Sequence, residues 1–376
     1  MRKLFLFILA ALLLQCQPVP PQDPVTVRTA GDDGVAAFRI PGIVTTQSGT
    51  LVAVYDIRHD SSRDLQGDIE IGISRSTDHG NTWEPMIVAL SMGEYGGLPR
   101  AENGVGDPCL LLDETTGELM IFATWVHGKG GQAAWWSAGS GFDPSETPQL
   151  LMVRSSDEGR TWSQPVNLTR QVKQPEWLFT FQAPGRGITM TDGTLVVPFQ
   201  HQGPDRTPAA GIMYSRDHGR TWTVSADAKS NTTESQVAEI APGVLLLSIR
   251  DNRGTGRAMY VTHDMGQTWT PHAADGLLPD PVCMASLLHV PTADNCLGRD
   301  ILLFANPADA KERRNMTLRI SFDGGATWPG AVLLDEGPCW GYSCLTMVDS
   351  ETVGIIYEGS KAHITFQAVP LQALEP

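Results

Sequence analysis

Three arginines stand beside apolar runs of this 376-residue chain: Arg39 in the phrase FRIP, Arg250 directly after residues 245–249, and Arg313 at the start of RRNMT. A guanidinium stays charged and presents a planar fork of N–H donors that matches a carboxylate in a bidentate manner. Each arginine alone is more simply explained as a surface residue at the end of a strand. If the fold brings all three together, they would form a cationic pocket for an anionic ligand.

The elements that would position such residues are built by repetition. The phrase Ser/Thr-x-Asp-x-Gly-x-Thr-Trp occurs five times, at residues 76–83, 155–162, 215–222, 262–269 and 321–328. In each copy the Asp carboxylate can accept hydrogen bonds from turn amides, the Gly can take a positive φ, and the Trp can pack beneath the turn. The unequal spacing of the copies is typical of one supersecondary unit per blade, with insertions between units.

Around the repeats the chain reads as strand, turn, strand almost throughout. Five pairs of apolar runs flank short turn sequences, at residues 42–57, 110–126, 188–199, 237–249 and 345–357. No window of a dozen residues shows helical periodicity. Together with terminal strands near Phe38 and residues 363–369, which could share a blade, these hairpins predict an all-β fold. We expect a six-bladed β-propeller, which gathers the inner strands of all its blades around one central opening.

Composition agrees with this fold and excludes several functions. Glycine (38), proline (26) and a charged fraction of only 18% indicate many short strands and turns. The formal net charge of −15 argues against a nucleic-acid-binding surface, which requires clustered Lys and Arg. The sequence contains no H-E-x-x-H motif, EF-hand loop, phosphate-binding loop or G-x-S-x-G elbow, so we expect neither a metal nor a cofactor.

Residues 1–16 predict an export signal. Arg2 and Lys3 precede an apolar run, residues 4–14, that is too short to span a bilayer. Cys16 follows as in a bacterial lipoprotein signal, although Gln15 departs from the small residue usual before such a cysteine, and a plain secretory signal is the alternative. Residues 17–26 are expected to form a Pro-rich tether, and residues 27–376 a single propeller domain. We therefore expect an exported monomer, periplasmic or on the cell surface, with a lipid anchor if Cys16 is acylated.

The FRIP phrase in register with five Asp-box repeats resembles the exo-α-sialidase (neuraminidase) superfamily, especially its bacterial members, over residues 30–370. Asp-boxes also occur in non-enzymatic propellers, so the FRIP phrase carries more of the resemblance. The resemblance implies a glycoside hydrolase. It also implies that Arg39, Arg250 and Arg313 clamp the carboxylate of the substrate, with Arg314 as the alternative to Arg313.

The resemblance further implies a catalytic tyrosine. Tyr342, in CWGYSCL, matches the nucleophile of the family, and Glu234, in ESQV, matches the glutamate that polarises it. A neutral phenol can approach an anomeric carbon that bears a carboxylate, whereas a carboxylate nucleophile would be repelled. Glu239 is a competing candidate for the glutamate, although its place in an apolar strand pattern is better explained by an outer or edge position.

The family's acid/base residue lies six positions after an arginine, which points to Asp64 after Arg58. Asp60 and Asp68 are close alternatives in the same acidic loop. Arg58 and Asp107, in Gly106-Asp107-Pro108, match two further substrate contacts, though each could equally hold a loop in place.

The resemblance therefore implies hydrolysis of terminal α-linked sialic acid from glycoproteins, glycolipids and oligosaccharides, with retention of configuration through a tyrosyl intermediate. A trans-sialidase or an intramolecular trans-sialidase would share these residues. A non-catalytic sialoglycan-binding propeller would need neither Tyr342 nor Glu234.

Overall fold

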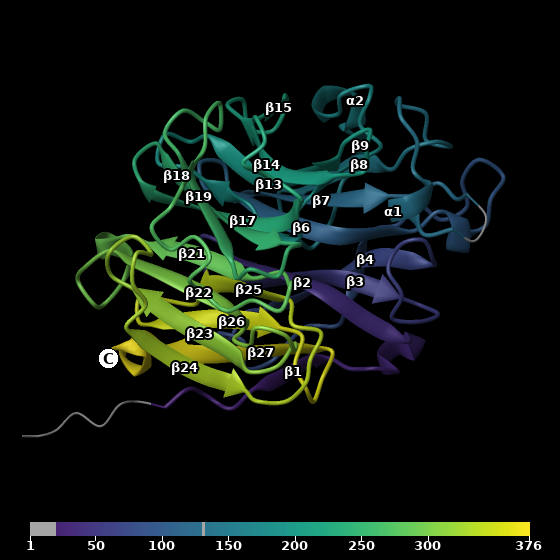
Figure 1. The fold of residues 1–376 in the computed structure, drawn as a ribbon. Coiled ribbons are helices and arrows are strands. Elements are labelled where there is room, and N and C mark those ends of the chain that lie inside the picture. The colour runs from purple at the N-terminus through teal and green to yellow at the C-terminus, as the bar shows by residue number, and fades with distance from the viewer. Residues whose placement is uncertain (1–19, 130–131) are drawn as a thin grey trace, which may run out of the picture.

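A computed structural model describes residues 20–129 and 132–376 of the chain, and in it six β-sheets are arranged as the blades of a propeller (Figure 1). The blades follow one another around the ring in the order of the sequence, as the colour gradient shows. The prediction of an all-β, six-bladed β-propeller is confirmed.

The first three blades are built from the N-terminal half of the chain. Blade one contains β2 (Ala37–Thr45), β3 (Leu51–Arg58), β4 (Ile69–Ser76) and β5 (Ile87–Leu90). Blade two contains β6 (Val105–Asp113), β7 (Glu118–Trp125), β8 (Gln149–Ser155), β9 (Val166–Asn167) and the added strand β11 (Gly185–Arg186). Blade three contains β10 (Phe179–Gln182), β12 (Ile188–Thr189), β13 (Leu195–Gln202), β14 (Pro208–Ser215), β15 (Thr223–Val224) and β16 (Lys229–Ser230).

The other three blades each have four strands. Blade four contains β17 (Thr232–Ala241), β18 (Val244–Asp251), β19 (Ala258–Thr262) and β20 (Thr270–Pro271). Blade five contains β21 (Ser286–Val290), β22 (Ile301–Pro307), β23 (Met316–Ser321) and β24 (Gly330–Asp335). Blade six contains β25 (Ser343–Met347), β26 (Thr352–Tyr357), β27 (Ile364–Pro370) and β1 (Val25–Arg28).

Helices in the described residues are single turns, which lie in the connections or, for η4, after the last strand. The α-helices are α1 (Ala134–Ser137) and α2 (Thr169–Val172), and the 3₁₀ turns are η1 (Asp32–Gly34), η2 (Arg100–Glu102), η3 (Thr292–Asp294) and η4 (Leu371–Leu374). In the part of the chain that the structure describes, none of these helices has the length and apolar character needed to cross a membrane.

The two ends of the chain close the ring with the expected C-terminal strand, β27, but with a different N-terminal strand. The strand that contains Phe38 is β2, the first strand of blade one, and β1 pairs antiparallel with β27, where Val25 lies opposite Phe366. Figure 1 shows β1, in purple, beside the yellow strands of blade six. The edge of β27 needs a partner, and a segment preceding β2 supplies it. Residues 25–26 of the expected tether therefore belong to the propeller.

Each Asp-box forms the turn between the third and fourth strands of a blade. In the first copy, Asp78 accepts hydrogen bonds from the N–H of Thr82 at 2.9 Å and from its hydroxyl at 2.6 Å, and Gly80 donates its N–H to the Ser76 hydroxyl at 2.9 Å. The same contacts recur in the other four copies. Blade six lacks a box because its fourth strand is β1, which no turn joins to β27.

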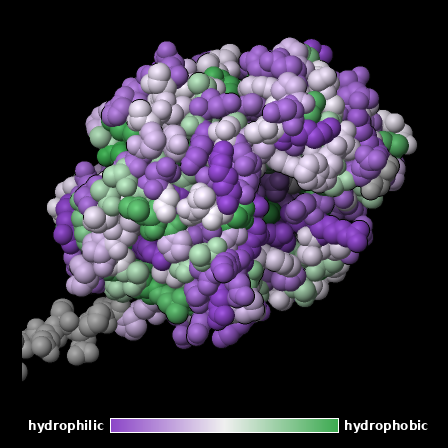
Figure 2. Space-filling view, in the orientation of Figure 1, coloured by the Kyte–Doolittle hydropathy of each residue, from purple (hydrophilic) through white to green (hydrophobic). Residues whose placement is uncertain are grey.

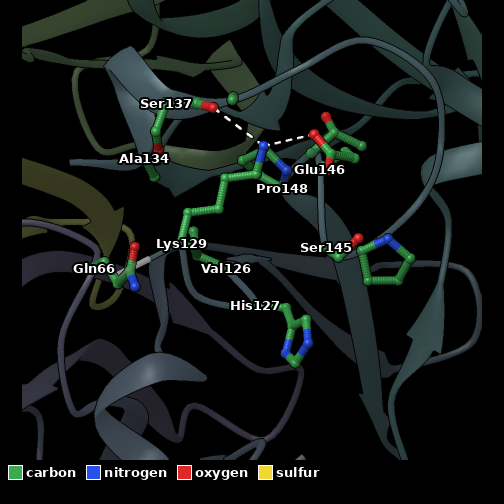
Figure 3. A pocket seen from close by; sticks show the side chains of 12 residues that line it. Gln66, Val126, His127, Lys129, Ala134, Ser137, Ser145, Glu146 and Pro148 are labelled. Carbon is green, nitrogen blue, oxygen red and sulfur yellow. Dashed lines mark hydrogen bonds and ion pairs between the residues drawn. The ribbon is translucent and has the colours of Figure 1, made fainter. Parts of the chain in front are cut away.

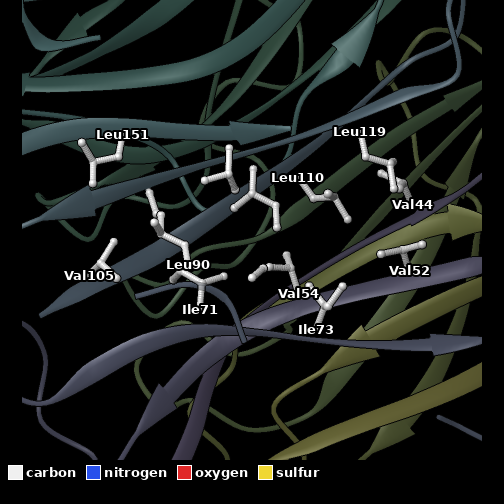
Figure 4. Close-up of a cluster of buried hydrophobic side chains, with 14 of the residues drawn as sticks. Val44, Val52, Val54, Ile71, Ile73, Leu90, Val105, Leu110, Leu119 and Leu151 are labelled. Atoms are coloured by element: carbon white, nitrogen blue, oxygen red, sulfur yellow. The ribbon is translucent and has the colours of Figure 1, made fainter. Parts of the chain in front are cut away.

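The apolar core lies between neighbouring blades. Figure 4 shows side chains of blade one, among them Val54 and Ile71, packed between the strands of blades one and two against Leu110 and Leu151. Because these strands are buried on both faces, apolar residues occupy consecutive positions along them and do not alternate with polar ones. The visible face of the molecule mixes polar and apolar residues, and one hollow opens among mostly hydrophilic ones (Figure 2).

The five predicted hairpins are present, and a sixth, β21–β22, was missed. Its connection, residues 291–300, contains η3 and is longer than the tight turns that mark the other hairpins. The described cysteines are free thiols, and three of the five, Cys109, Cys283 and Cys344, are buried.

Candidate active site

The first strands of several blades begin at one face of the propeller, where polar residues gather. Arg39 lies on β2 and Glu234 on β17, both in the first half of the strand, and Tyr342 directly precedes β25. Because adjacent strands are antiparallel, the second strands end at the same face. That arrangement adds Arg58, at the end of β3, and Arg250, near the end of β18.

Tyr342, Glu234 and Arg250 form one hydrogen-bonded group. The Tyr342 hydroxyl donates to Glu234 Oε1, and Arg250 Nη1 donates to Glu234 Oε2 at 2.7 Å and to the Tyr342 oxygen at 3.2 Å. Burial, followed by the charge of Glu234, raises the pKa of Tyr342 well above its usual value, although Arg250 opposes the shift. The phenol is therefore neutral at neutral pH, and a carboxylate is placed to take its proton.

Three arginines from three blades lie around this phenol. Besides the contact from Arg250, the Cζ atoms of Arg39 and Arg313 lie 5.5 and 5.8 Å from the centre of the Tyr342 ring. Arg39 Nη1 is also 3.7 Å from Asp64 Oδ1. The fold thus brings these residues together from positions scattered along the whole chain, and creates a local cationic site on a protein of negative net charge.

A glutamate that the sequence analysis did not single out, Glu358, supports this group from within the protein. Its fully buried carboxylate accepts hydrogen bonds from Arg39 Nε at 2.8 Å and Nη2 at 3.3 Å, and from the backbone N–H of Ile40 and Tyr342, each at 3.0 Å. The one sequence feature that could have indicated Glu358 is its position as an acidic residue directly after the apolar strand β26, at the end of the strand that faces the site. One carboxylate therefore fixes both the guanidinium of Arg39 and the backbone of Tyr342.

Arg313 rather than Arg314 faces the tyrosine. Arg313 donates from Nη1 to the carbonyl of Trp340 and from Nη2 to the carbonyl of Val282, each at 3.0 Å. The Trp340 ring in turn lies 4.7 Å from the guanidinium carbon of Arg39. Arg314 instead pairs with Glu312 at 3.9 Å.

Asp64 stands at the open side of the site, with 82% of its side chain exposed. Its Oδ1 accepts a hydrogen bond from Arg58 Nη1 at 2.8 Å. Partial burial raises the pKa of Asp64, but Arg58, and after it Arg39, lower that pKa by more. Of the alternatives in the same loop, Asp68 contacts Arg100 at 3.4 Å, and Asp60 is exposed.

Asp107 is the second carboxyl that faces the arginines. Its φ is 58°, an unusual value for a residue with a side chain, and it lies where the register between β6 and β7 shifts. Burial, followed by the charges of Asp56 and Asp64, raises the pKa of Asp107 well above its usual value.

Glu239, the competing candidate for the glutamate, lies at the opposite end of β17. Its carboxylate accepts hydrogen bonds from the backbone N–H of Thr191 at 2.7 Å and of Gly243 at 2.8 Å, so it holds two hairpin turns together. Glu239 is therefore remote from Tyr342, but it lies on the same first strand of the blade as Glu234 and not at the outer position expected from the sequence.

Two cavities lie away from these residues. One of about 580 Å³ opens where the first strands end, and its largely apolar lining contains neither Tyr342 nor the three arginines. The other, of about 10 Å³, is shown in Figure 3, where Lys129 reaches toward Glu146 at 2.6 Å and the carbonyl of Ser137 at 3.4 Å. A space of that size holds about one water molecule. The convergent charged groups, not cavity size, therefore locate the candidate site.

Within residues 20–129 and 132–376, no cluster of three or more His, Cys, Asp or Glu side chains is arranged to hold a metal ion. What the arrangement offers is a neutral phenol beside a carboxylate, a cluster of fixed cations and a partly exposed acid. Such a set can bind an anion and form a covalent bond to carbon next to it.

The repeated blades and this site define a class of protein, and comparison with known sequences gives the same class. The sequence profile described as a BNR repeat-like domain matches residues 49–356. The sialidase of Clostridium perfringens is 30% identical over 86% of this chain and 86% of its own length. The sialidase of Bacteroides fragilis (strain YCH46) is 56% identical over 93% of this chain. The chain belongs to the sialidase family.

Solved structures agree. The Hadza microbial sialidase Hz136 has a TM-score of 0.93 and 57% identity, covering 94% of this chain and 69% of its own. The intramolecular trans-sialidase from Ruminococcus gnavus has a TM-score of 0.74 at 20% identity, covering 93% of this chain and 99% of its own, which shows a shared fold. The chain spans 64% of the length of the Bacteroides fragilis relative and 53% of that of the Micromonospora viridifaciens sialidase.

Proposed function

We propose that this protein is an exo-α-sialidase, which hydrolyses terminal α-linked sialic acid from glycoproteins, glycolipids and oligosaccharides. The observation that carries the proposal is the Tyr342–Glu234–Arg250 hydrogen-bonded group, set among arginines from three blades. The substrate carboxylate binds to Arg39, Arg250 and Arg313, whose charge does not depend on pH in the working range.

The reaction follows from the placement of the groups. The Tyr342 oxygen attacks the anomeric carbon as Glu234 takes the phenolic proton, while Asp64 protonates the departing glycosidic oxygen. The carbon–oxygen bond to the aglycone breaks as the bond to tyrosine forms. Asp64, now a carboxylate, then removes a proton from water, which displaces the tyrosine, and Glu234 returns the proton to the phenolate. Two displacements at one carbon retain its configuration.

We propose Arg58 and Asp107 as further contacts to the sugar, because Arg58 donates to Asp64 at 2.8 Å and the backbone of Asp107 is bound beside Arg58 through Asp56. We further propose export of the protein, from the basic and apolar segments before residue 16. Cys16 and the rest of that signal lie outside the described residues, and its acylation is a separate proposal that mass determination of the mature protein would test.

Replacing the nucleophile tests the proposal. We expect Tyr342→Phe to lower turnover of a fluorogenic sialoside by on the order of 10³-fold or more, because the variant lacks the hydroxyl that forms the proposed covalent intermediate. The melting temperature should stay close to that of the wild type. Tyr357→Phe, at a buried tyrosine whose hydroxyl contacts Gln367 at 3.3 Å, is the matched control and should keep its activity. Unchanged turnover in Tyr342→Phe would refute the assignment.

Analysis of the reaction products distinguishes hydrolysis from transfer of the sialic acid and from binding without catalysis. Incubation with a sialoside and a galactoside acceptor gives free sialic acid for a hydrolase, a new sialoside for a trans-sialidase, and an anhydro sugar for the intramolecular enzyme. A binding propeller leaves the sialoside intact.

A further inference from the structure

Asp56 is a fully buried carboxylate behind the candidate site. It lies on β3, directly opposite Arg39 of β2, in a strand that is otherwise apolar as far as Ile57. An ionised carboxylate is costly to bury unless charged or polar donors satisfy it. Its partners therefore indicate what the residue is for.

The two oxygens of Asp56 bind groups from two different blades. Oδ2 accepts hydrogen bonds from Arg58 Nε at 3.0 Å and Nη2 at 2.8 Å, within blade one. Oδ1 accepts a hydrogen bond from the backbone N–H of Asp107 at 2.9 Å, in blade two. Both partners are residues that face the sugar in the proposed function.

Arg58 carries the connection further toward the open side of the site. Its remaining terminal nitrogen, Nη1, donates to Asp64 Oδ1 at 2.8 Å and to the carbonyl of Ser62 at 2.7 Å. The guanidinium of Arg58 thus links the buried carboxylate to the proposed acid/base residue and to the loop on which that residue stands.

The chain around Asp107 is shaped to reach the carboxylate. A Cβ atom at Gly106 would lie 3.3 Å from both oxygens of Asp56, so a side chain here would have to displace the carboxylate by a few tenths of an ångström, and glycine allows the close approach without that shift. The carbonyl of Asp107 accepts a hydrogen bond from the Gln182 side chain. The Asp107 peptide is therefore held on one side by Asp56 and on the other by Gln182, in a conformation with positive φ.

We propose that Asp56 is a positioning residue, which fixes the guanidinium of Arg58 and the peptide of Asp107 relative to each other and thereby sets the place of Asp64. This inference rests on the proposed sialidase function. It requires the carboxylate, because every partner of Asp56 is a hydrogen-bond donor. An asparagine has one acceptor oxygen, and its NH₂ group would face a donor on one side or the other.

A double-mutant cycle in the full chain tests the proposal. We expect Asp56→Asn to lower kcat/KM for a fluorogenic sialoside roughly 10- to 100-fold, because charge-assisted hydrogen bonds that hold two substrate contacts are lost. Arg58→Met, which keeps the length of the side chain, should cause a similar loss. The loss in the double variant should be smaller than the product of the two single losses, because Asp56 acts in part through Arg58 and in part through the backbone of Asp107.

Asp113→Asn controls for the general cost of changing a buried aspartate. Asp113 is also fully buried and accepts hydrogen bonds from the backbone N–H of Thr115 and Thr116, but it lies at the far end of β6. This variant should lose stability while keeping kcat and KM. Melting temperatures of all variants separate misfolding from loss of positioning.

The outcomes are distinct. Wild-type kinetic parameters in folded Asp56→Asn, or losses that multiply in the double variant, would overturn this inference while leaving the sialidase proposal intact. Absence of sialoside cleavage by the wild type would overturn the sialidase proposal and this inference with it.

Discussion

Asp64 must carry a proton to act as a general acid, yet the protein groups around it favour its ionised form. Partial burial raises its pKa, but the charge and hydrogen bond of Arg58, and then the charge of Arg39, lower it by more. A bound sugar would exclude water from Asp64 and engage these arginines through its own polar groups. Both changes favour the protonated acid, so substrate binding should itself prepare Asp64 for proton transfer.

A pH profile tests this at the level of the single residue. The basic limb of kcat/KM reports the acid in the free enzyme, and the basic limb of kcat reports the acid in the complex. Because the arginines of the protein lower the pKa of Asp64 and a bound sugar should raise it, we expect the basic limb of kcat at a higher pH than that of kcat/KM. Steady-state kinetics with a fluorogenic sialoside across the pH range would measure both limbs. Coincident limbs would show that binding leaves the acid unchanged.

The sequence alone pointed to the residues that would touch the substrate but not to those behind them. Arg39 and Tyr342 stand in phrases specific enough to be matched to a family. Asp56 and Glu358 are single acids beside or within apolar strands. Asp56 binds Arg58 two positions away, but it also binds the backbone of Asp107, 51 positions away, and Glu358 binds an arginine 319 positions away. No local pattern reveals such pairs, because they exist only after the blades have closed into a ring.

At the scale of elements, the Asp-boxes join neighbouring blades as well as closing turns. The glycine of each box sits against the blade before it in the ring: Gly80 approaches Phe366 of blade six, and Gly219 approaches Met120 of blade two. Trp83 of the first box likewise packs edge-on against Phe366, with ring centres 5.4 Å apart. The repeats thus contribute to the propeller in two ways: they set the geometry of the turn within a blade, and they pack that turn against the neighbouring blade.

The carboxylates of the boxes should make stability depend on pH in the acid range. Hydrogen bonds from Thr221 and Ser215 outweigh a small burial effect and lower the pKa of Asp217 to about 2. Since the folded pKa lies below the unfolded value of about 3.9, the stabilisation is present above pH 4 and is lost as the pH falls toward 2. We expect Asp217→Asn to lower the melting temperature at pH 7 by roughly 2–4 °C, and the difference from wild type to shrink near pH 2.

Calorimetric or spectroscopic melts at several pH values would measure this difference. Asp60→Asn, at an exposed aspartate outside the boxes, is the control and should melt as the wild type does. A deficit in Asp217→Asn that stays constant down to pH 2 would rule out the carboxylate as its source.

In the molecule as a whole, the number of Asp-boxes predicts one blade too few. Each box forms the turn between the third and fourth strands of a blade, and in blade six no turn joins those two strands. Five boxes and five hairpins reached six blades only with the added argument that the two ends share a sheet. The two ends do share a sheet, as expected. The N-terminal strand of that sheet is β1, however, and not β2, which was expected from the sequence. A strand of only four residues has no sequence pattern that distinguishes it from a tether. Closure of the ring depends on how the N-terminal and C-terminal strands pair with each other, and the local sequence of neither strand predicts that pairing.

The closing strand joins two blades and should therefore contribute strongly to the stability of the ring. Val27 of β1 is buried in a cluster with Phe366 of blade six and Phe38 of blade one, and Arg28 donates to the Tyr55 hydroxyl at 2.8 Å. We expect Val27→Asp to lower the free energy of unfolding by about 2–4 kcal/mol, because it buries an unpaired charge. Thr26→Asp, on the exposed side of the same strand, should change it by less than about 0.5 kcal/mol. Urea unfolding of the two variants beside the wild type would measure both free energies of unfolding. If Val27→Asp lowered the free energy of unfolding as little as Thr26→Asp does, β1 would be a dispensable edge strand and other contacts would close the ring.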